Sequence, residues 1–294
     1  MADMNFDPNE LRAKYNPDGS LTRRMQERML EILGVIDGIC RKHGISYWLS
    51  GGSMLGAVRH HGFIPWDDDV DLAMPRDDYE KFLKIAPRLL SSNLQIVNYR
   101  TDPKYQYYIT RIRDIETKVE EVRIGNHYRY TNASIDIFPL DGTPNTLWIR
   151  KIYFLRVMMH RALMSLCYKD SIDRSRKRGK FEQVFLAIME RLPIEKIFDP
   201  YKEKCKIDKI MRKNKIEDSD NIGCLMGAYR TNQIVPKRYF GKGKMYSFET
   251  LTLRGPELYD EYLTQMYGDY MKLPPKESQK VHFKIVEIHG EKIK

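Results

Sequence analysis

The chain has 294 residues, with 50 Lys and Arg against 40 Asp and Glu and a formal net charge of +10. Hydrophobic residues make up 42% and aromatic residues 11%, which excludes a disordered chain and leaves room for one large domain or two small ones. The four cysteines are widely spaced, the first 19 residues lack a signal-peptide core, and no apolar run reaches 18 residues. We therefore expect a soluble, cytoplasmic protein rather than a secreted, zinc-ribbon or membrane-spanning one.

The first ninety residues alternate between helical and extended patterns. Ser20 caps a predicted helix that ends at Gly44, because apolar residues recur every three or four positions between them. The predicted elements that follow are a strand at 47–49, a helix from Ser53 to Arg59, an alternating strand at 68–74 and a helix at 76–90.

The rest of the chain changes character twice. The pattern of residues 94–124 predicts two or three strands, and a further strand is predicted from Ser134 to Phe138, where Pro139 closes it. Residues 145–216 are helix-like, with an exposed loop expected at Lys169–Lys180. A last helix is predicted at 257–267. We divide the chain accordingly into a core at 1–144, a basic helical insertion at 145–216 and a part at 217–294 that completes the core.

The positive charge is concentrated in the insertion. Residues 145–216 contain 19 Lys and Arg and 8 Asp and Glu, a net of +11, whereas the remaining residues have a net of −1. Two interpretations stay open: a helical surface that meets an anionic membrane, or a packed subdomain with a solvated basic face. No aromatic and basic nucleic-acid motif accompanies this charge, so we expect no nucleic-acid partner.

The stretch from Gly51 to Asp71 carries the strongest chemical signal. On the predicted strand, Asp69 and Asp71 project from one face, about 6 to 7 Å apart, where they can converge on a hard divalent cation such as Mg²⁺. Gly51 and Gly52 permit close approach of a phosphate to the backbone, and Ser53 begins a helix whose amino end favours anions. The pattern predicts a metal-dependent site for phosphoryl chemistry, although a glycine turn and a solvated acidic loop can look the same.

Three longer segments resemble the LicD family, which includes bacterial phosphocholine transferases and, more distantly, fukutin-type ribitol-phosphate transferases. They are Tyr47-Trp48-Leu49-Ser50-Gly51-Gly52-Ser53-Met54-Leu55-Gly56-Ala57-Val58-Arg59-His60, continuing from Gly62 to Asp71, then Ile135-Asp136-Ile137-Phe138-Pro139-Leu140-Asp141-Gly142, and Tyr267-Gly268-Asp269-Tyr270-Met271-Lys272-Leu273-Pro274-Pro275. The resemblance implies an α+β protein with a polymerase-beta-like nucleotidyltransferase core, built as a mixed sheet with flanking helices, plus the inserted helical segment.

The resemblance also assigns roles to residues. It implies that Asp69, Asp71 and Asp136 are catalytic and bind Mg²⁺ or Mn²⁺; Asp136 alternates with Ile135 and Ile137, as a strand residue does. The expected substrate-binding residues are Gly51, Gly52, Ser53, Arg59, His60, Asp68, Arg111 and Arg113. For Arg59, His60 and the two later arginines, a structural role is an open alternative.

The implied reaction moves a substituted phosphate, most simply phosphocholine from CDP-choline, onto a sugar hydroxyl of a cell-surface glycan such as teichoic acid or lipopolysaccharide. A lipid-linked acceptor would place the enzyme at the inner membrane face. Tyr105, Tyr107, Tyr108, Tyr128 and Tyr130 are candidates to bind a quaternary ammonium, but strand tyrosines usually pack, so choline, ethanolamine and polyol head groups stay open.

Two rival functions share these motifs. A nucleotidyltransferase would use the same carboxylates but leave the nucleotide on its acceptor. A non-catalytic basic membrane- or RNA-binding protein is disfavoured, because all three carboxylate positions are intact.

Overall fold

The computed structural model describes residues 6–121, 129–168, 197–279, 283–288 and 291–292 of the chain. The expected loop at Lys169–Lys180 lies outside these ranges. Within them, none of the helices combines the length and the apolar character needed to cross a lipid bilayer.

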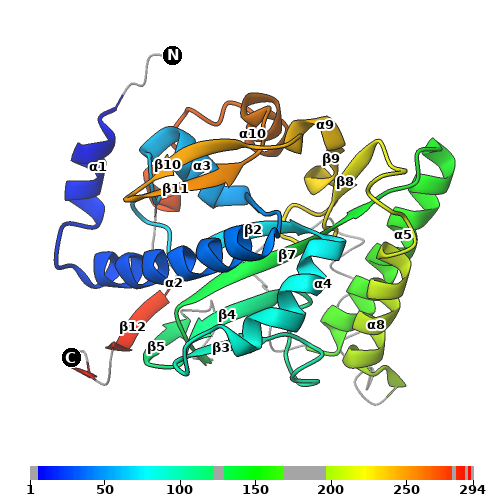
Figure 1. Ribbon diagram of the computed structural model, residues 1–294, viewed down its shortest axis with the longest axis horizontal. Helices are drawn as coiled ribbons and strands as arrows, with labels where there is room; N and C mark the ends of the chain where they lie inside the picture. The colour runs from blue at the N-terminus through cyan, green and yellow to red at the C-terminus, as the bar shows by residue number, and fades with distance from the viewer. Residues whose placement is uncertain (1–5, 122–128, 169–196, 280–282, 289–290, 293–294) are drawn as a thin grey trace.

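A mixed sheet forms the centre of the protein (Figure 1). Its strand order is β1 (Trp48–Leu49), β2 (Val70–Pro75), β7 (Ser134–Gly142), β4 (Thr110–Asp114) and β3 (Leu94–Val97), and β8 (Asn221–Gly223) joins β7 to β9 (Val235–Pro236). Strands β2 and β7 run parallel, and the other neighbours in this sheet are antiparallel.

Two smaller sheets accompany the central one. The first is the hairpin of β10 (Lys244–Phe248) and β11 (Leu251–Gly255). The second has the order β13 (Glu291–Lys292), β12 (Phe283–Ile288), β5 (Thr117–Glu121) and β6 (Arg129–Thr131). Residues beyond 216 therefore contribute strands to two sheets that also contain earlier strands, while the three-part division of the chain stays a prediction.

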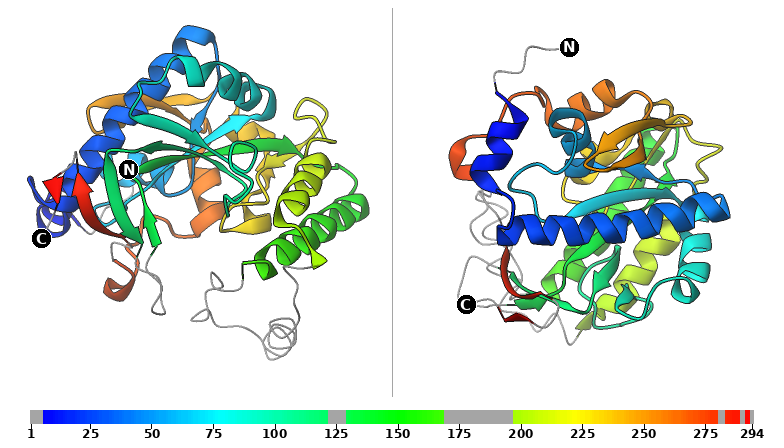
Figure 2. Two further views of the ribbon diagram at one scale, coloured as in Figure 1. Left: turned by 90° about the horizontal axis from the view of Figure 1, so that it is seen from below. Right: turned by 60° about the vertical axis from the view of Figure 1, so that its left-hand side comes forward.

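Helices flank the central sheet. Their bounds are α1 (Pro8–Tyr15), α2 (Leu21–His43), α3 (Gly51–His60), α4 (Arg76–Ile85), α5 (Leu147–Leu166), α8 (Pro200–Met211), α9 (Lys237–Phe240) and α10 (Tyr259–Tyr267), with 3₁₀ turns η1 (Ala86–Arg88), η3 (Arg230–Gln233) and η4 (Lys276–Ser278). Helix α2 crosses the sheet, and α5 and α8 lie side by side at one end of the molecule (Figures 1 and 2). The expected mixed sheet with flanking helices is thus present.

The helix signals read from the sequence act as expected. The Ser20 hydroxyl accepts a hydrogen bond from the Arg23 N–H, and Gly44 ends α2 with a left-handed φ of 58°. Met29, Leu33 and Ile36 of this helix are fully buried in the main core, together with Val70 and Leu72 of β2.

A second, smaller core lies beneath the helical segment. It joins Tyr153 and Val157 of α5 to Ile207 and Met211 of α8, with Tyr99 and Tyr108 from the sheet side. The two described helices between 147 and 211 are therefore packed against the protein on one face.

Several predicted element boundaries are wrong. Helix α3 begins at Gly51, not at Ser53, and α10 begins at Tyr259, not at residue 257. Strand β2 begins at Val70, not Asp68, because the Asp67 N–H closes a turn with the Ile64 carbonyl and the Asp67 carbonyl accepts from Gln26. Helix α4 stops at Ile85 and continues only as a 3₁₀ turn, since Pro87 cannot donate the next helical hydrogen bond.

A further correction concerns β7, which does not close at Pro139. The strand runs on to Gly142, with Pro139 paired to Met74 of β2. Its pairing with β4 ends at Ile137, so beyond that point a proline is tolerated as on an edge strand.

Candidate active site

Three neighbouring strands place two carboxylates and a guanidinium in one row. In the parallel pairing of β2 with β7, Asp71 lies directly opposite Asp136. In the antiparallel pairing of β7 with β4, Asp136 lies opposite Arg111. Because paired residues share a face of the sheet and adjacent strands are about 4.8 Å apart, the three side chains leave the sheet together.

Arg111 and Asp136 form a bidentate ion pair. The Arg111 Nε donates to Asp136 Oδ1 at 2.8 Å, and Nη2 donates to Oδ2 at 3.1 Å. The guanidinium also stacks on the ring of Tyr107, 4.4 Å from its centroid. Arg111 thus orients Asp136 and compensates its charge.

Asp69 and Asp71 carry negative charge in excess of this pair. Burial raises the pKa of Asp71 well above its usual range, and Asp69, Asp136 and Asp67 raise it further against the opposing effect of Arg111. Asp69 is exposed, yet the protein atoms around its carboxylate reduce its hydration, and this effect together with Asp136 raises its pKa to about 7. A cation bound here would relieve this repulsion.

The glycine pair brings the start of α3 against these carboxylates. A Cβ on Gly51, whose φ is +52°, would lie 2.7 Å from Asp71 Oδ2, and one on Gly52 would lie 3.0 Å from Asp67 Oδ2. The Ser50 N–H donates to the Asp71 carbonyl, and the Asp71 N–H donates to Ser53 Oγ at 2.8 Å. In this structure Gly51, Gly52 and Ser53 therefore fit α3 closely to Asp67 and Asp71.

Three tyrosines that the sequence analysis did not single out border the same place. The hydroxyl of Tyr262 accepts from the Gly51 N–H and bonds Ser50 Oγ, both at 3.1 Å. The Tyr267 hydroxyl lies 3.7 Å from where a Gly51 Cβ would be. Its ring meets Tyr229 edge-on, with centroids 5.3 Å apart, and Tyr229 is 44% exposed. An aromatic pair thus reaches solvent beside the carboxylates.

Only Tyr267 could have been found in advance, because it opens the Tyr267 to Pro275 segment. Tyr229 lies in a loop whose sequence has no comparable motif, and Tyr262 reads as an ordinary helix residue.

Arg59 and His60 hold the chain around the site. Arg59 is buried, and its Nη1 donates to the carbonyls of Tyr270 (2.7 Å) and Lys272 (3.4 Å), while its Nε donates to His60 Nε2 at 3.0 Å. Burial lowers the pKa of Arg59 to about 10, partly offset by Asp67. Burial and Arg59 lower the pKa of His60 to about 3, so this imidazole is neutral. The two residues connect α3 to the segment after α10.

The remaining candidates lie at the margins. Asp68 is buried, and its charge contributes to the raised pKa of both Asp67 and Asp69. Arg113 is on the same strand face as Arg111, but its guanidinium binds Gln95 Oε1 on β3, so it is not brought to the carboxylates.

The tyrosines that the sequence suggested as candidates to bind a quaternary ammonium lie in different parts of the structure. Tyr107 packs on Arg111, and Tyr108 donates to Asp208 at 2.7 Å in the second core. Tyr105 is buried beside Tyr107. Tyr128 and the side chain of Tyr130 lie outside what the structure describes.

The donor set has the chemistry of a divalent cation site. Carboxylate oxygens in a negatively charged setting are what Mg²⁺ and Mn²⁺ bind, and Asp69 and Asp71 provide them. Among the described residues, however, no three His, Cys, Asp or Glu side chains are grouped closely enough to hold a metal ion by themselves. Asp136 is paired with Arg111, so Asp69 and Asp71 fit a cation most directly, and binding of the metal by Asp136 as well stays a prediction.

Comparisons with known proteins point to one family. The family described as LicD/FKTN/FKRP, nucleotidyltransferase domain, matches residues 44–166, which include the glycine pair, the aspartates at 67, 68, 69, 71 and 136, and Arg111. The lipopolysaccharide cholinephosphotransferase LicD of Haemophilus influenzae is 34% identical over 272 residues, covering 89% of this chain and 96% of that protein.

More distant relatives match a short stretch only. Human ribitol 5-phosphate transferase FKRP is 45% identical over 56 residues, 19% of this chain and 10% of that protein. An uncharacterised protein of Rickettsia typhi, RT0683, is 47% identical over 47 residues, 16% of this chain and 15% of that protein.

Proposed function

This chain belongs to the LicD family, and on that premise we propose that it is a phosphotransferase that moves phosphocholine from CDP-choline onto a sugar hydroxyl of a cell-surface glycan. The observation that carries the proposal is the register of β2 and β7, which pairs Asp71 with Asp136 beside the amino end of α3. The core would then be a version of the polymerase-beta-like nucleotidyltransferase fold, and the reaction would take place in the cytoplasm.

Asp69 and Asp71 would hold Mg²⁺ or Mn²⁺. When bound, the ion would neutralise the donor pyrophosphate and the departing CMP. Their pKa values are raised first by the loss of hydration and then by the neighbouring aspartates, and a bound cation would offset this excess of negative charge. The amino end of α3, at Gly51 and Gly52, supplies the partial positive charge that a phosphate favours.

Asp136 would receive the proton of the acceptor hydroxyl. The hydroxyl oxygen forms a bond to the choline-bearing phosphorus, the bond from that phosphorus to the CMP oxygen breaks, and CMP leaves with the bonding electron pair. Arg111 holds both Asp136 oxygens and so fixes the direction in which this carboxylate can accept the proton.

Tyr229 and Tyr267 are our candidates to recognise the head group. A quaternary ammonium binds aromatic faces, and nearby carboxylates strengthen the attraction. We expect Tyr229→Leu to lower kcat/KM for CDP-choline by about 2- to 30-fold. Tyr229→Phe should retain it, and a CDP donor with the neutral isostere 3,3-dimethylbutanol should respond equally little to both changes. An equal loss for the neutral donor would contradict head-group recognition.

The acceptor is the least constrained part of the proposal. The Haemophilus relative is named for lipopolysaccharide, and a lipid-linked precursor of such a glycan or of a teichoic acid offers the same kind of sugar hydroxyl.

The function is tested by product analysis. The protein is incubated with CDP-choline, CDP-ethanolamine and a CDP-polyol plus Mg²⁺, with and without candidate glycans. Glycan-dependent release of CMP with phosphocholine on the glycan supports the proposal. Release of phosphocholine with a nucleotide on the acceptor would indicate the nucleotidyltransferase instead, and no turnover with any donor or acceptor would favour a non-catalytic protein.

A further inference from the structure

Helix α5 has a second apolar face that points away from the protein. Its inner face carries Tyr153, Val157 and Met164, all buried. The opposite face carries four apolar side chains whose exposed fractions are large: Trp148 (64%), Ile152 (49%), Leu155 (70%) and Met159 (50%). Their spacing of four, three and four residues aligns them along one side of the helix, and we refer to them as the α5 stripe.

The helix cannot easily rotate to bury this stripe. His160 Nδ1 lies 2.6 Å from Glu203 Oε2 on α8. Arg161 Nη1 donates to the carbonyls of Leu225 (2.6 Å) and Gly227 (2.8 Å). These contacts fix the angle of α5 about its own axis, so the outward position of the stripe is part of the fold.

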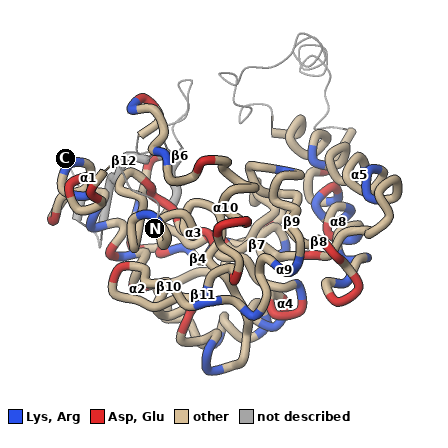
Figure 3. The backbone as a smooth tube through the Cα atoms, turned by 90° about the horizontal axis from the view of Figure 1, so that it is seen from above, with Lys and Arg blue, Asp and Glu red and all other residues tan. Residues whose placement is uncertain are grey.

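A row of four exposed apolar residues is unusual, although single exposed ones are common. Exposed Lys151 and Arg156 flank the stripe on its two sides, and the sequence of α5 contains four basic residues and no acidic one. Figure 3 shows α5 at the edge of the molecule. The segment 145–216 to which α5 belongs has a net charge of +11.

We propose that the α5 stripe docks on an anionic lipid surface, with its apolar side chains at the level of the acyl boundary and Lys151 and Arg156 among the headgroups. Charge complementarity selects this occupant, because a neutral protein groove would not require the basic flanks. Trp and Leu on one side of a helix and Lys and Arg beside them are the composition of helices that lie in the membrane interface. This inference does not depend on the reaction proposed above.

The test uses the full chain and extruded vesicles. The chain has three tryptophans, of which Trp48 and Trp66 are buried, so a vesicle-induced blue shift of emission reports Trp148. We expect the shift, and cosedimentation, with vesicles containing phosphatidylglycerol and much weaker binding to pure phosphatidylcholine. Trp148→Phe should remove the shift while most of the cosedimentation remains.

Two variants separate the contributions of the stripe and its flanks. Ile152→Glu with Leu155→Glu should weaken binding to anionic vesicles at least about tenfold, and Lys151→Gln with Arg156→Gln should reduce the preference for anionic lipid. Val35→Glu is the matched control, because Val35 is 41% exposed on α2, and it should bind as wild type. Unchanged melting temperatures would show that the variants are folded.

Three results would overturn the proposal. They are absence of binding to anionic vesicles by the wild type, equal binding by the Ile152→Glu, Leu155→Glu double variant, or self-association of the wild type in sedimentation velocity that this double variant abolishes. The last result would assign the stripe to a contact between copies of the chain.

Discussion

Strands β2 and β7 carry charged side chains at both of their ends, and the two ends differ in how those charges are compensated. At the amino ends, Asp71 and Asp136 lie side by side with Asp67 and Asp69 nearby. At the carboxyl ends, Arg76 follows β2, and its guanidinium forms two hydrogen bonds with Asp141 of β7.

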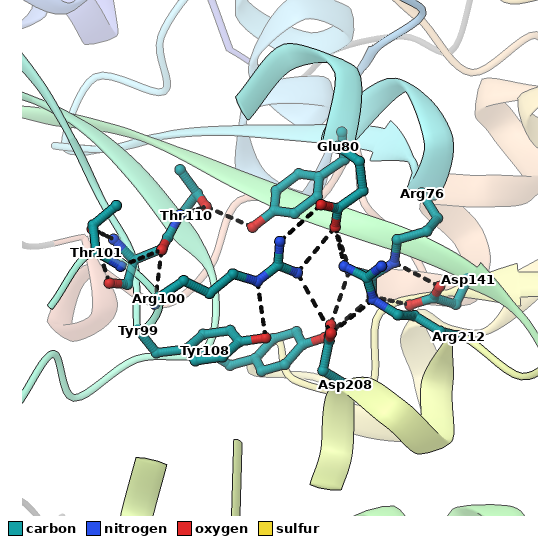
Figure 4. A network of polar contacts seen from close by, with 12 residues as sticks. Arg76, Glu80, Tyr99, Arg100, Thr101, Tyr108, Thr110, Asp141, Asp208 and Arg212 are labelled. Carbon is teal, nitrogen blue, oxygen red and sulfur yellow. Dashed lines mark hydrogen bonds and ion pairs between the residues drawn. The ribbon is translucent and has the colours of Figure 1, made fainter. Parts of the chain in front are cut away.

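The network around Arg76 is balanced (Figure 4). Arg76 also reaches Asp208 at 3.1 Å, Arg212 pairs with Asp208 at 2.7 Å and with Glu80, and Arg100 grips both oxygens of Glu80 at 2.8 and 3.0 Å. Burial alone would raise the pKa of Glu80, but its hydrogen bonds and ion pair with Arg100 lower this pKa below its usual value. The network thus contains three acidic side chains and three arginines, and its ion pairs connect α4 and α8 to the sheet.

The aspartates at the amino ends of β2 and β7 are not balanced by positive charge in this way. Four aspartates face Arg111 and Arg59, and Arg111 is committed to Asp136 while Arg59 donates to main-chain carbonyls. Excess negative charge costs stability, so it is retained where a cation or substrate uses it. We therefore expect the Arg76 network to have a structural role and the aspartates around Asp71 to have a chemical one.

The largest effect is expected from Asp71→Asn. Loss of a carboxylate that we propose to bind the cation should reduce kcat by about 10³-fold, whereas removal of one charge from a repelling group should leave the free energy of unfolding unchanged or raise it. Turnover of CDP-choline and urea unfolding of the same preparation measure the two. A destabilised but active variant would reverse the roles of the two ends.

At the balanced end, Arg76→Met should mainly affect stability. It leaves Asp141, whose side chain is 1% exposed, without its ion-pair partner, and we expect a loss of about 3–5 kcal/mol in the free energy of unfolding. Arg113→Met is the control, since its guanidinium binds only an exposed Gln95 in the described contacts, and it should cost less than about 1 kcal/mol.

Arg111→Lys tests the ion pair between Arg111 and Asp136 at the amino ends of the strands. Lysine keeps the charge but cannot make the bidentate contact with Asp136, so we expect kcat to fall by about 10- to 100-fold with little change in the melting temperature. If kcat were unchanged, orientation of Asp136 would not matter to the reaction.

The smallest effect is a pH dependence of stability without divalent cation. Because the reduced hydration of its carboxylate, Asp136 and Asp68 raise the pKa of Asp69 to about 7, its contribution to stability is fully present below its unfolded pKa and is lost as the pH rises toward 7. Unfolding in EDTA at pH 5 and pH 7.5 should show a larger decline for wild type than for Asp69→Asn. Added Mg²⁺ at pH 7.5 should raise the melting temperature of wild type more than that of the variant.

Much of the fold could be read from local patterns. Ser20 and Gly44 bound α2 because their capping chemistry acts within one helical turn, and the alternation around Asp71 and Asp136 placed both on strands with buried neighbours. The extension of β7 through Pro139 could not be read, because it depends on where β4 stops pairing.

For the candidate site, the sequence by itself determined the types of chemical group: the aspartates, the glycine pair and the arginines, together with a family resemblance that the comparisons confirm. Only the tertiary structure decided how they meet. The row of Asp71, Asp136 and Arg111 depends on strand register, Tyr229 arrives from a distant loop, and Arg113 is drawn away to Gln95. The exposed face of α5 has the same origin, because an apolar helix has several possible inner faces, and the packing of α8 against one of them leaves the stripe outside. Residue types are local properties of the chain, whereas their juxtaposition depends on pairings between segments far apart in it.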